Sequence, residues 1–152
     1  MAFIRLKKVA GKHYACLVEN TWTTKGPRQK VVAYLGKCIA LPQAPAPAGG
    51  SDIRSLVAAE LRSHGFDEKL VLGKVKVNVH TGTVREGKRR VTLSLNGGFL
   101  CDYTLRRLLV FQPVVEATPG YALARAFSDA GLRVSREHFV TIYKKLYNAK
   151  AQ

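Results

Sequence analysis

The sequence predicts an α+β protein, because strand-like and helix-like patterns fill different parts of the chain. Runs rich in aromatic and β-branched residues occupy the first 40 positions, and apolar and polar residues alternate within residues 75–95. Apolar residues at helical spacing fill residues 53–64 and much of the C-terminal third. We therefore predict a small N-terminal β-hairpin module over residues 1–40 and a Pro/Ala/Gly linker over residues 41–50. An α+β domain follows over residues 51–152, in which a basic β-hairpin packs with about four helices.

The N-terminal hairpin is predicted from two apolar runs, residues 14–18 and 31–35, which flank a polar centre. Their aromatic and β-branched side chains suit a pleated surface, and Gly26-Pro27 favours a turn between them. Residues 3–8 mix apolar with basic side chains and predict a further strand beside the hairpin, with a turn at Gly11-Lys12. The hairpin tip is cationic, because it carries Lys25, Arg28 and Lys30.

Residues 41–50, LPQAPAPAGG, predict an extended and semi-rigid spacer, because three prolines alternate with small or polar residues. Such a tether would let two basic parts of one chain engage separate sites on a large partner. A helix is predicted over residues 53–64, with Ser51 or Asp52 as its N-cap and Gly65 at its end.

A second hairpin is predicted from two stretches in which apolar side chains recur at every other position. Val75, Val77 and Val79 form the first stretch, and residues 91, 93 and 95 form the second. The connection between them, residues 81–89, is rich in glycine and basic side chains. We expect one face of this hairpin to pack and the other to be polar and basic.

Three helices are predicted for the C-terminal part. Asp102 can cap a helix over residues 103–111, which Pro113 ends. Thr118-Pro119 is a start signal for a helix that runs to residue 130, where Gly131 ends it. Ser135 caps the last helix, over residues 136–147.

The charge balance indicates a polyanionic partner. The chain has 25 Lys and Arg against 10 Asp and Glu, a net charge of +15, and residues 1–40 hold eight cations against the single acid Glu19. Ordinary solvated surfaces intersperse the two signs, whereas a concentrated positive field attracts polymers of phosphate. Nucleic acid is therefore the partner that the composition favours.

The candidate RNA contacts are the basic side chains of both hairpins and of the following helix, with one indole and one amide at the first tip. They are Lys7, Lys8, Lys12, Trp22, Lys25, Arg28, Gln29, Lys30, Lys37, Lys74, Lys76, Arg85, Lys88, Arg89, Arg90, Arg106 and Arg107. Lysine and arginine neutralise phosphates, and an indole can stack on an unpaired base.

Some of these residues have a structural interpretation as well. For Trp22 we favour packing in a small core over base stacking, because a large aromatic in a small module has few other apolar partners. For Lys74 and Lys76 a solvated sheet face is as good an interpretation as contact with RNA. The run Lys88-Arg89-Arg90 favours phosphate contact, because three adjacent cations repel one another until an anion relieves them.

A resemblance to known proteins is carried by residues 17–20 (LVEN), 25–30 (KGPRQK) and 34–37 (YLGK). Residues 14–37 resemble the N-terminal module of one family of insertion-sequence transposases, and similar segments open some short basic archaeal proteins. The resemblance implies a nucleic-acid-binding module. The chain is too short for a transposase catalytic domain and shows no spaced set of metal-binding carboxylates, so the resemblance does not extend to transposition.

Enzyme classes find little support. The four histidines are scattered without a metal-binding spacing, and neither a GxGxxG nor a Walker motif is present. We expect no catalytic residues, no metal, no cofactor and no small-molecule substrate.

The odd number of cysteines, without a CxxC pair, indicates neither a disulfide framework nor a zinc finger. No apolar run spans a membrane and no signal peptide is recognised, so we expect a cytoplasmic protein without membrane contact.

The sequence thus predicts a structural RNA-binding protein, with residues 51–152 as its main RNA-binding domain. In its size, its basicity and its combination of a hairpin with a tether, the chain is similar to small archaeal ribosomal proteins. We expect ribosomal RNA or another structured RNA as its partner, with neighbouring ribosomal proteins as further contacts. The alternative is a DNA-binding protein, related either to the transposase module or to a helix-turn-helix regulator built from the last two helices. In the last helix, however, Phe139 and Tyr143 stand where base-reading side chains would be polar, which favours a packed helical hairpin.

Overall fold

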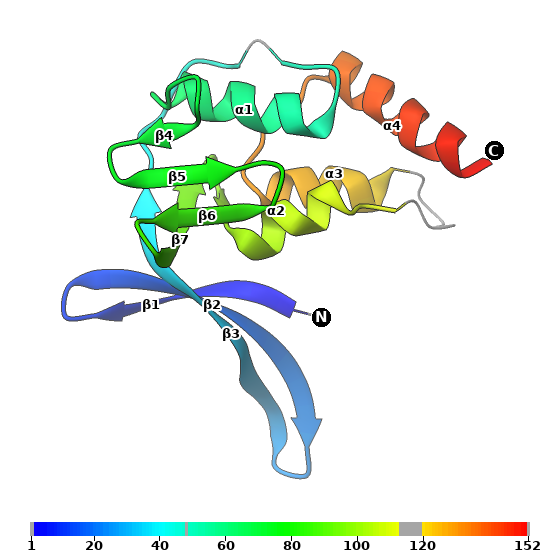
Figure 1. The fold of residues 1–152 in the computed structure, drawn as a ribbon. Helices are drawn as coiled ribbons and strands as arrows, with labels where there is room; N and C mark the ends of the chain where they lie inside the picture. The colour runs from blue at the N-terminus through cyan, green and yellow to red at the C-terminus, as the bar shows by residue number, and fades with distance from the viewer. Residues whose placement is uncertain (1, 48, 113–119, 152) are drawn as a thin grey trace.

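The computed structural model describes residues 2–47, 49–112 and 120–151, and there it shows an α+β fold with an eight-stranded mixed sheet and four helices (Figure 1). The strands are ordered β1, β2, β3, β7, β6, β5, β4, and β8 pairs with β7. Among these strands β3 and β7 pair in parallel and the other neighbours are antiparallel. The predicted fold class is confirmed at this level.

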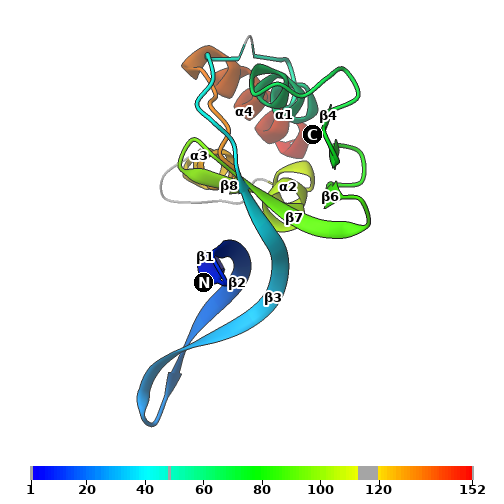
Figure 2. The same ribbon diagram turned by 90° about the vertical axis from the view of Figure 1, so that its left-hand side faces the viewer.

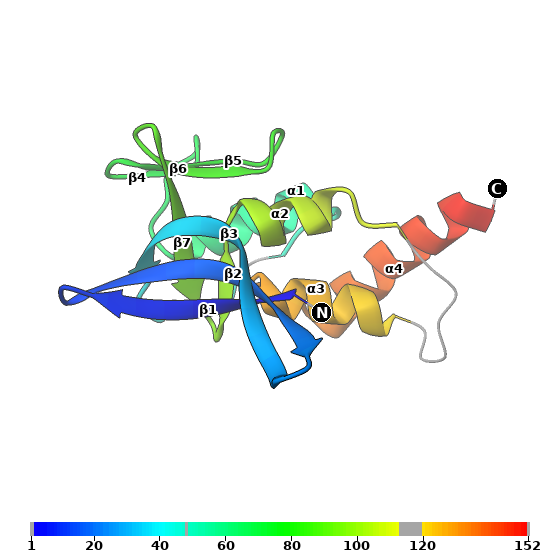
Figure 3. The ribbon, with the colours of Figure 1, turned by 90° about the horizontal axis from the view of Figure 1, so that it is seen from below.

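Three long strands form the N-terminal part and lie side by side (Figure 3): β1 (Ala2–Val9), β2 (Lys12–Thr23) and β3 (Gly26–Ala40). The strand predicted beside the hairpin is β1, and its turn into β2 is made by Ala10 and Gly11, both with positive φ. The two predicted runs are inner segments of β2 and β3, and the hairpin extends well beyond them. Beyond Val18 every residue of β2 is exposed, so the outer part of the hairpin projects from the body (Figure 1).

The end of β3 is part of the same sheet as the rest of the molecule. Residues 37–40 pair in parallel with residues 91–94 of β7 (Arg89–Leu95), as the view in Figure 2 shows. Residues 1–40 and 51–152 therefore share one sheet. The remaining strands are β4 (Val71–Leu72), β5 (Val75–Asn78), β6 (Thr83–Glu86) and β8 (Gly98–Leu100).

The prediction that residues 81–89 form only a connection is wrong, because β6 lies within them and separates β5 from β7. Gly82 and Gly87, with φ of 73° and 61°, turn the chain on either side of this four-residue strand. Within β6, Val84 alone is fully buried. A strand this short, with one buried side chain, gives no detectable alternation in the sequence.

The four helices are α1 (Ile53–Ser63), α2 (Asp102–Leu109), α3 (Tyr121–Asp129) and α4 (Arg136–Ala151). As predicted, the Asp52 carboxylate caps α1 by accepting from the Ser55 backbone, and Ser135 Oγ accepts from the backbone of His138 in α4. Gly131, with φ of 75°, follows the end of α3. The predicted start signal Thr118-Pro119 lies outside the described residues.

Asp102 is not the N-cap of α2, as predicted, but its first helical residue. Cys101 occupies the cap position, and the hydroxyl of Thr104 accepts from its backbone N–H at 3.1 Å. The carboxylate of Asp102 instead accepts a hydrogen bond from the backbone of Val84 in β6, at 2.9 Å. The side chain thus links α2 to the sheet and does not cap its own helix.

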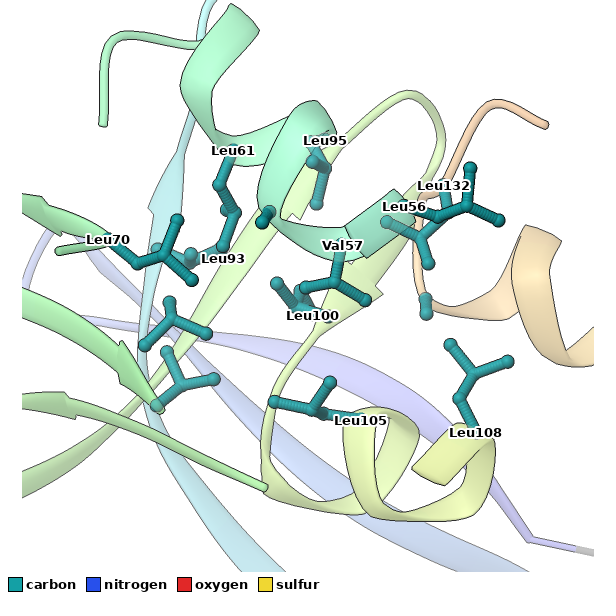
Figure 4. Close-up of a cluster of buried hydrophobic side chains, with 14 of the residues drawn as sticks. Leu56, Val57, Leu61, Leu70, Leu93, Leu95, Leu100, Leu105, Leu108 and Leu132 are labelled. Atoms are coloured by element: carbon teal, nitrogen blue, oxygen red, sulfur yellow. The ribbon is translucent and has the colours of Figure 1, made fainter. Parts of the chain in front are cut away.

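The main core lies between the sheet and the helices (Figure 4). Leucines and valines from α1, α2, β7 and β8 meet there, among them Leu61, Leu93, Leu100 and Leu105, none of which is exposed. A smaller cluster joins the N-terminal strands to the start of α2, because Cys101 packs with Leu17 and Leu35. The N-terminal strands are therefore fastened both by strand pairing and by apolar contacts.

The predicted linker contains neither helix nor strand at its described positions, but it is held against the body. The backbone of Leu41 donates to the Ser94 carbonyl at 2.8 Å. The guanidinium group of Arg133 donates to the carbonyls of Ala44 and Pro45, at 2.8 and 3.0 Å. These bonds fix the path of the segment between the sheet and α1.

Candidate nucleic-acid interface

A groove of about 620 Å³ lies where the base of the N-terminal hairpin meets β6 and β7. Strands that are far apart in the sequence contribute to it, and its wall carries four cations, one carboxylate and two tyrosines. The lining residues are Lys12, Tyr14, Tyr34, Gly36, Lys37, Glu86, Arg89, Arg90 and Val91. The groove thus gathers four of the predicted RNA contacts: Lys12, Lys37, Arg89 and Arg90.

The two tyrosines of the groove stack on each other across β2 and β3. The ring centroids of Tyr14 and Tyr34 are 6.3 Å apart and their planes are inclined by 29°. The register of the hairpin shifts between Ala15 and Cys16, so that Tyr14 lies opposite Lys37 while Cys16 lies opposite Tyr34. The partner of Tyr14 is thus three positions along β3 from Tyr34, and the two rings stack diagonally across the pair of strands.

The phenol of Tyr34 stays neutral at physiological pH. Desolvation raises the pKa of Tyr34, and the neighbouring Tyr14 and Cys16 raise it further, while Arg89 lowers it. The side chain is nevertheless 56% exposed, so part of its ring faces the groove or solvent. A neutral, partly open aromatic ring beside a guanidinium group is a suitable surface for a nucleobase.

The groove is held in place by a close approach of two strands at Gly36. A Cβ at this position would lie 1.8 Å from the Arg90 carbonyl oxygen, and φ is 88°, so only glycine fits without movement. Two residues earlier in β3, the Tyr34 carbonyl accepts a hydrogen bond from Arg90 Nη1 at 3.1 Å. The backbone that carries Tyr34 is therefore fixed against β7.

Two of the predicted contacts hold a buried carboxylate. Arg85 Nη1 lies 2.7 Å from both oxygens of Asp102, and Arg90 Nε lies 3.4 Å from one of them. Asp102 has an exposed fraction of only 4%, so its charge needs these partners. We therefore assign Arg85 mainly to the fold. Arg90 serves both the fold and the groove.

The helical arginines of the prediction lie apart from the groove. Arg107 pairs with Asp129 at 3.0 Å, which links α2 to α3. Arg106 is exposed on α2, and its aliphatic part lies beside Gly82. Neither residue lines the groove.

The hairpin tip is a second cationic region. Lys25, Arg28 and Lys30 are exposed there, and Gln29 accepts a hydrogen bond from Arg5 at 2.6 Å. The prediction that Trp22 packs in a core is wrong: the indole is 84% exposed, because the outer hairpin has no other layer to cover it. A shallow hollow beside it is lined by residues 20–22 and 27–29.

The remaining predicted contacts are exposed around these two regions. Lys7 and Lys8 lie on β1 opposite Tyr14 and His13 of β2. Lys88 is in the turn between β6 and β7, next to Arg89. Lys74 and Lys76 lie at β5, two strands away from β7. Sequence reasoning missed Tyr14 and Tyr34 as groove residues, because the groove forms only where β6 and β7 lie beside the hairpin, and no local pattern indicates that arrangement.

Comparisons with protein-family models, with curated proteins and with solved structures found no match to this chain. Within the described ranges no group of three or more histidine, cysteine, aspartate or glutamate side chains is placed to hold a metal ion. None of the helices in those ranges has the length and apolar character that crossing a membrane requires.

Proposed function

We propose that this protein binds structured RNA, chiefly through phosphates, and that it serves as a component or accessory factor of the ribosome in contact with ribosomal RNA. One observation carries the proposal: three of the four cations of the groove, and all three cations of the hairpin tip, form no ion pair with a carboxylate of the described residues. In the described part of the chain, no ion pair involves Lys12, Lys37 or Arg89, nor the three cations of the tip. The arginines that do pair, such as Arg85 and Arg133, stabilise the fold.

The shape of the N-terminal part supports an extended contact. Residues 19–23 and 27–32 are all exposed, and at about 3.3 Å per residue these arms project on the order of 20 Å. A narrow cationic hairpin of this reach can follow a phosphate backbone between RNA helices, while the groove binds a second part of the same RNA. The ribosome supplies such closely packed helices.

The proposal is tested by measuring the affinity for a folded ribosomal RNA fragment over a range of salt concentrations. Six free cations on phosphates predict a slope of log K against log salt of about −4 to −5, at about 0.7–0.9 per contact. Fluorescence of Trp22, the single tryptophan of the sequence, reports whether the tip takes part. A flat salt dependence, or equal affinity for a DNA duplex of the same length, would contradict the proposal.

The ribosomal assignment needs a separate measurement. Tagged protein in a cell-lysate gradient is expected to sediment with a ribosomal subunit at low salt and to leave it at high salt, since phosphate contacts weaken as salt rises. Protein that stays at the top of the gradient, while binding purified RNA, would leave RNA binding standing and exclude the ribosome as its site.

A further inference from the structure

Of the two stacked tyrosines of the groove, Tyr34 is 56% exposed and Tyr14 is half-buried beside it. Among the hydrogen bonds of the described residues, none involves the phenol oxygen of Tyr14 or Tyr34. Tyrosines that pack into a protein usually give their hydroxyl a partner. Tyr34 does not belong to the small apolar cluster of Leu17, Leu35 and Cys101.

The surroundings of the rings are those of a nucleotide site. Lys12, Lys37 and Arg89 line the same groove and carry no intramolecular ion pair in the described ranges. The volume of about 620 Å³ falls within the roughly 300–1,000 Å³ of sites that enclose small ligands. Aromatic rings bind a base through its face, and cations beside them bind the adjoining phosphates.

The backbone that carries Tyr34 is also held in place before any ligand binds. Gly36 brings β3 against the Arg90 carbonyl, and Arg90 donates to the backbone oxygen of Tyr34. Arg90 is in turn fixed by the buried Asp102. A rigid aromatic surface loses little conformational entropy on binding, which favours its use for recognition.

We infer that Tyr34, backed by Tyr14, stacks on an unpaired base of the bound RNA, while Lys12, Lys37 and Arg89 contact the phosphates beside that base. Bases within a duplex already stack on their neighbours, so this site selects RNA in which a bulge or loop stands next to a helix. The inference rests on the proposed RNA binding and names the RNA feature that the groove selects.

The test compares two short RNA hairpins that differ only in a single bulged 2-aminopurine. Wild-type protein is expected to bind the bulged RNA about tenfold more tightly than the fully paired one, and to quench the 2-aminopurine fluorescence on binding. In Tyr34→Leu the preference disappears while the affinity for the paired RNA is kept. Tyr34→Phe retains the preference, because the ring remains.

The controls separate this inference from the proposed function. Lys37→Gln with Arg89→Gln weakens binding to both RNAs, because phosphates are present in both. If wild-type protein binds both RNAs equally and leaves the fluorescence unchanged, the stacking site is refuted while RNA binding stands. If it binds neither RNA, the proposed function fails first. Circular dichroism of each variant shows that its fold is intact.

Discussion

At the scale of single residues, Gly36 decides how the N-terminal hairpin meets the rest of the molecule. Glycine is required at position 36 for two separate reasons: φ is 88°, and a Cβ would lie against the Arg90 carbonyl. At Gly11 only the first reason applies, because φ is 80° but no atom lies within 4 Å of the site of a Cβ. The pair therefore allows backbone strain to be separated from steric conflict.

We expect Gly11→Ala to lower the free energy of unfolding by about 1–2 kcal/mol, the cost of a left-handed backbone for an L-residue. Gly36→Ala should cost about 1–3 kcal/mol more, because β3 has to move away from β7. Urea unfolding followed by circular dichroism measures both values. Equal losses in the two variants would show that the strands separate at Gly36 without cost.

Glu60 also joins parts of the chain that are far apart in the sequence, and it is almost completely buried in α1. Its carboxylate accepts from the Arg133 backbone at 2.8 Å and lies 2.6 Å from Arg133 Nη2. Burial alone raises the pKa of Glu60, but the hydrogen bonds and charge of Arg133 outweigh it, so that the pKa is lowered below the ordinary 4.5. His64 lies beside the pair, with Nδ1 donating to the Pro42 carbonyl at 3.0 Å.

The lowered pKa of Glu60 fixes the sign of a pH effect. The folded state holds the carboxylate more strongly than the unfolded state, so the stabilisation is complete above the ordinary pKa and is lost as pH falls through the folded value. Glu60→Gln is expected to lose about 3 kcal/mol at neutral pH. Thermal melts should show this difference shrinking as the pH falls below the ordinary pKa of 4.5, because protonation of Glu60 then removes the charge that the variant lacks. A difference that stays constant with pH would contradict the ionised pair.

The sequence predicts single side chains well only where local rules decide. Asp52 and Ser135 are recognisable as caps, because the pattern of a helix start is local. General aromatic statistics favour a core position for Trp22, yet no second layer covers the outer hairpin. The carboxylate of Asp102 bonds to β6, a partner that no sequence spacing reveals. Long-range partners decide both cases.

At the scale of elements, the N-terminal hairpin is a stable arm with a cationic end. Strand pairing continues to Thr23↔Gly26, and Thr23 Oγ1 donates to the Gly26 carbonyl at 2.8 Å. The cations of the tip contribute no ion pair to the described fold. Their charge can therefore be removed without loss of structure.

We expect the triple variant Lys25→Gln, Arg28→Gln, Lys30→Gln to bind RNA more weakly and to reduce the salt slope by about 1 for each phosphate that is no longer neutralised. Its unfolding free energy should stay within about 0.5 kcal/mol of wild type. The matched control is Lys69→Gln, Arg136→Gln, Lys144→Gln, which removes the same number of charges after α1 and in α4, the elements opposite the hairpin (Figure 1). If both triple variants lose the same affinity, net charge binds RNA and the hairpin has no special part.

Elements were predictable where their apolar residues show a period. The long strands of the first hairpin, the three-helix order of the C-terminal part, α1 and the alternating valines of β5 do so. The strands β4 and β8 are too short to show a period, and β6 has only one buried side chain. The groove was beyond prediction for the same reason, since it forms where β6 and β7 meet the bulged end of the hairpin.

At the scale of the whole molecule, residues 1–40 and 51–152 are joined in two independent ways. The β3–β7 ladder forms one connection, and the cluster of Cys101 with Leu17 and Leu35 forms the other. Arg133 also holds the segment between them, through the carbonyls of Ala44 and Pro45. The groove and the hairpin tip thus keep a fixed spacing, and separation of the parts would expose Cys101.

We therefore expect the two parts to unfold in one cooperative transition. In a Cys16→Ser, Cys38→Ser variant, Cys101 is the only thiol of the chain and none of it is exposed. Its reaction with a thiol reagent along a urea gradient should rise at the same concentration at which the helical circular dichroism is lost, because both report global unfolding. If the thiol became reactive at lower urea while the helices persisted, the N-terminal strands would detach on their own. The groove, which needs both parts, would then form only when they are docked.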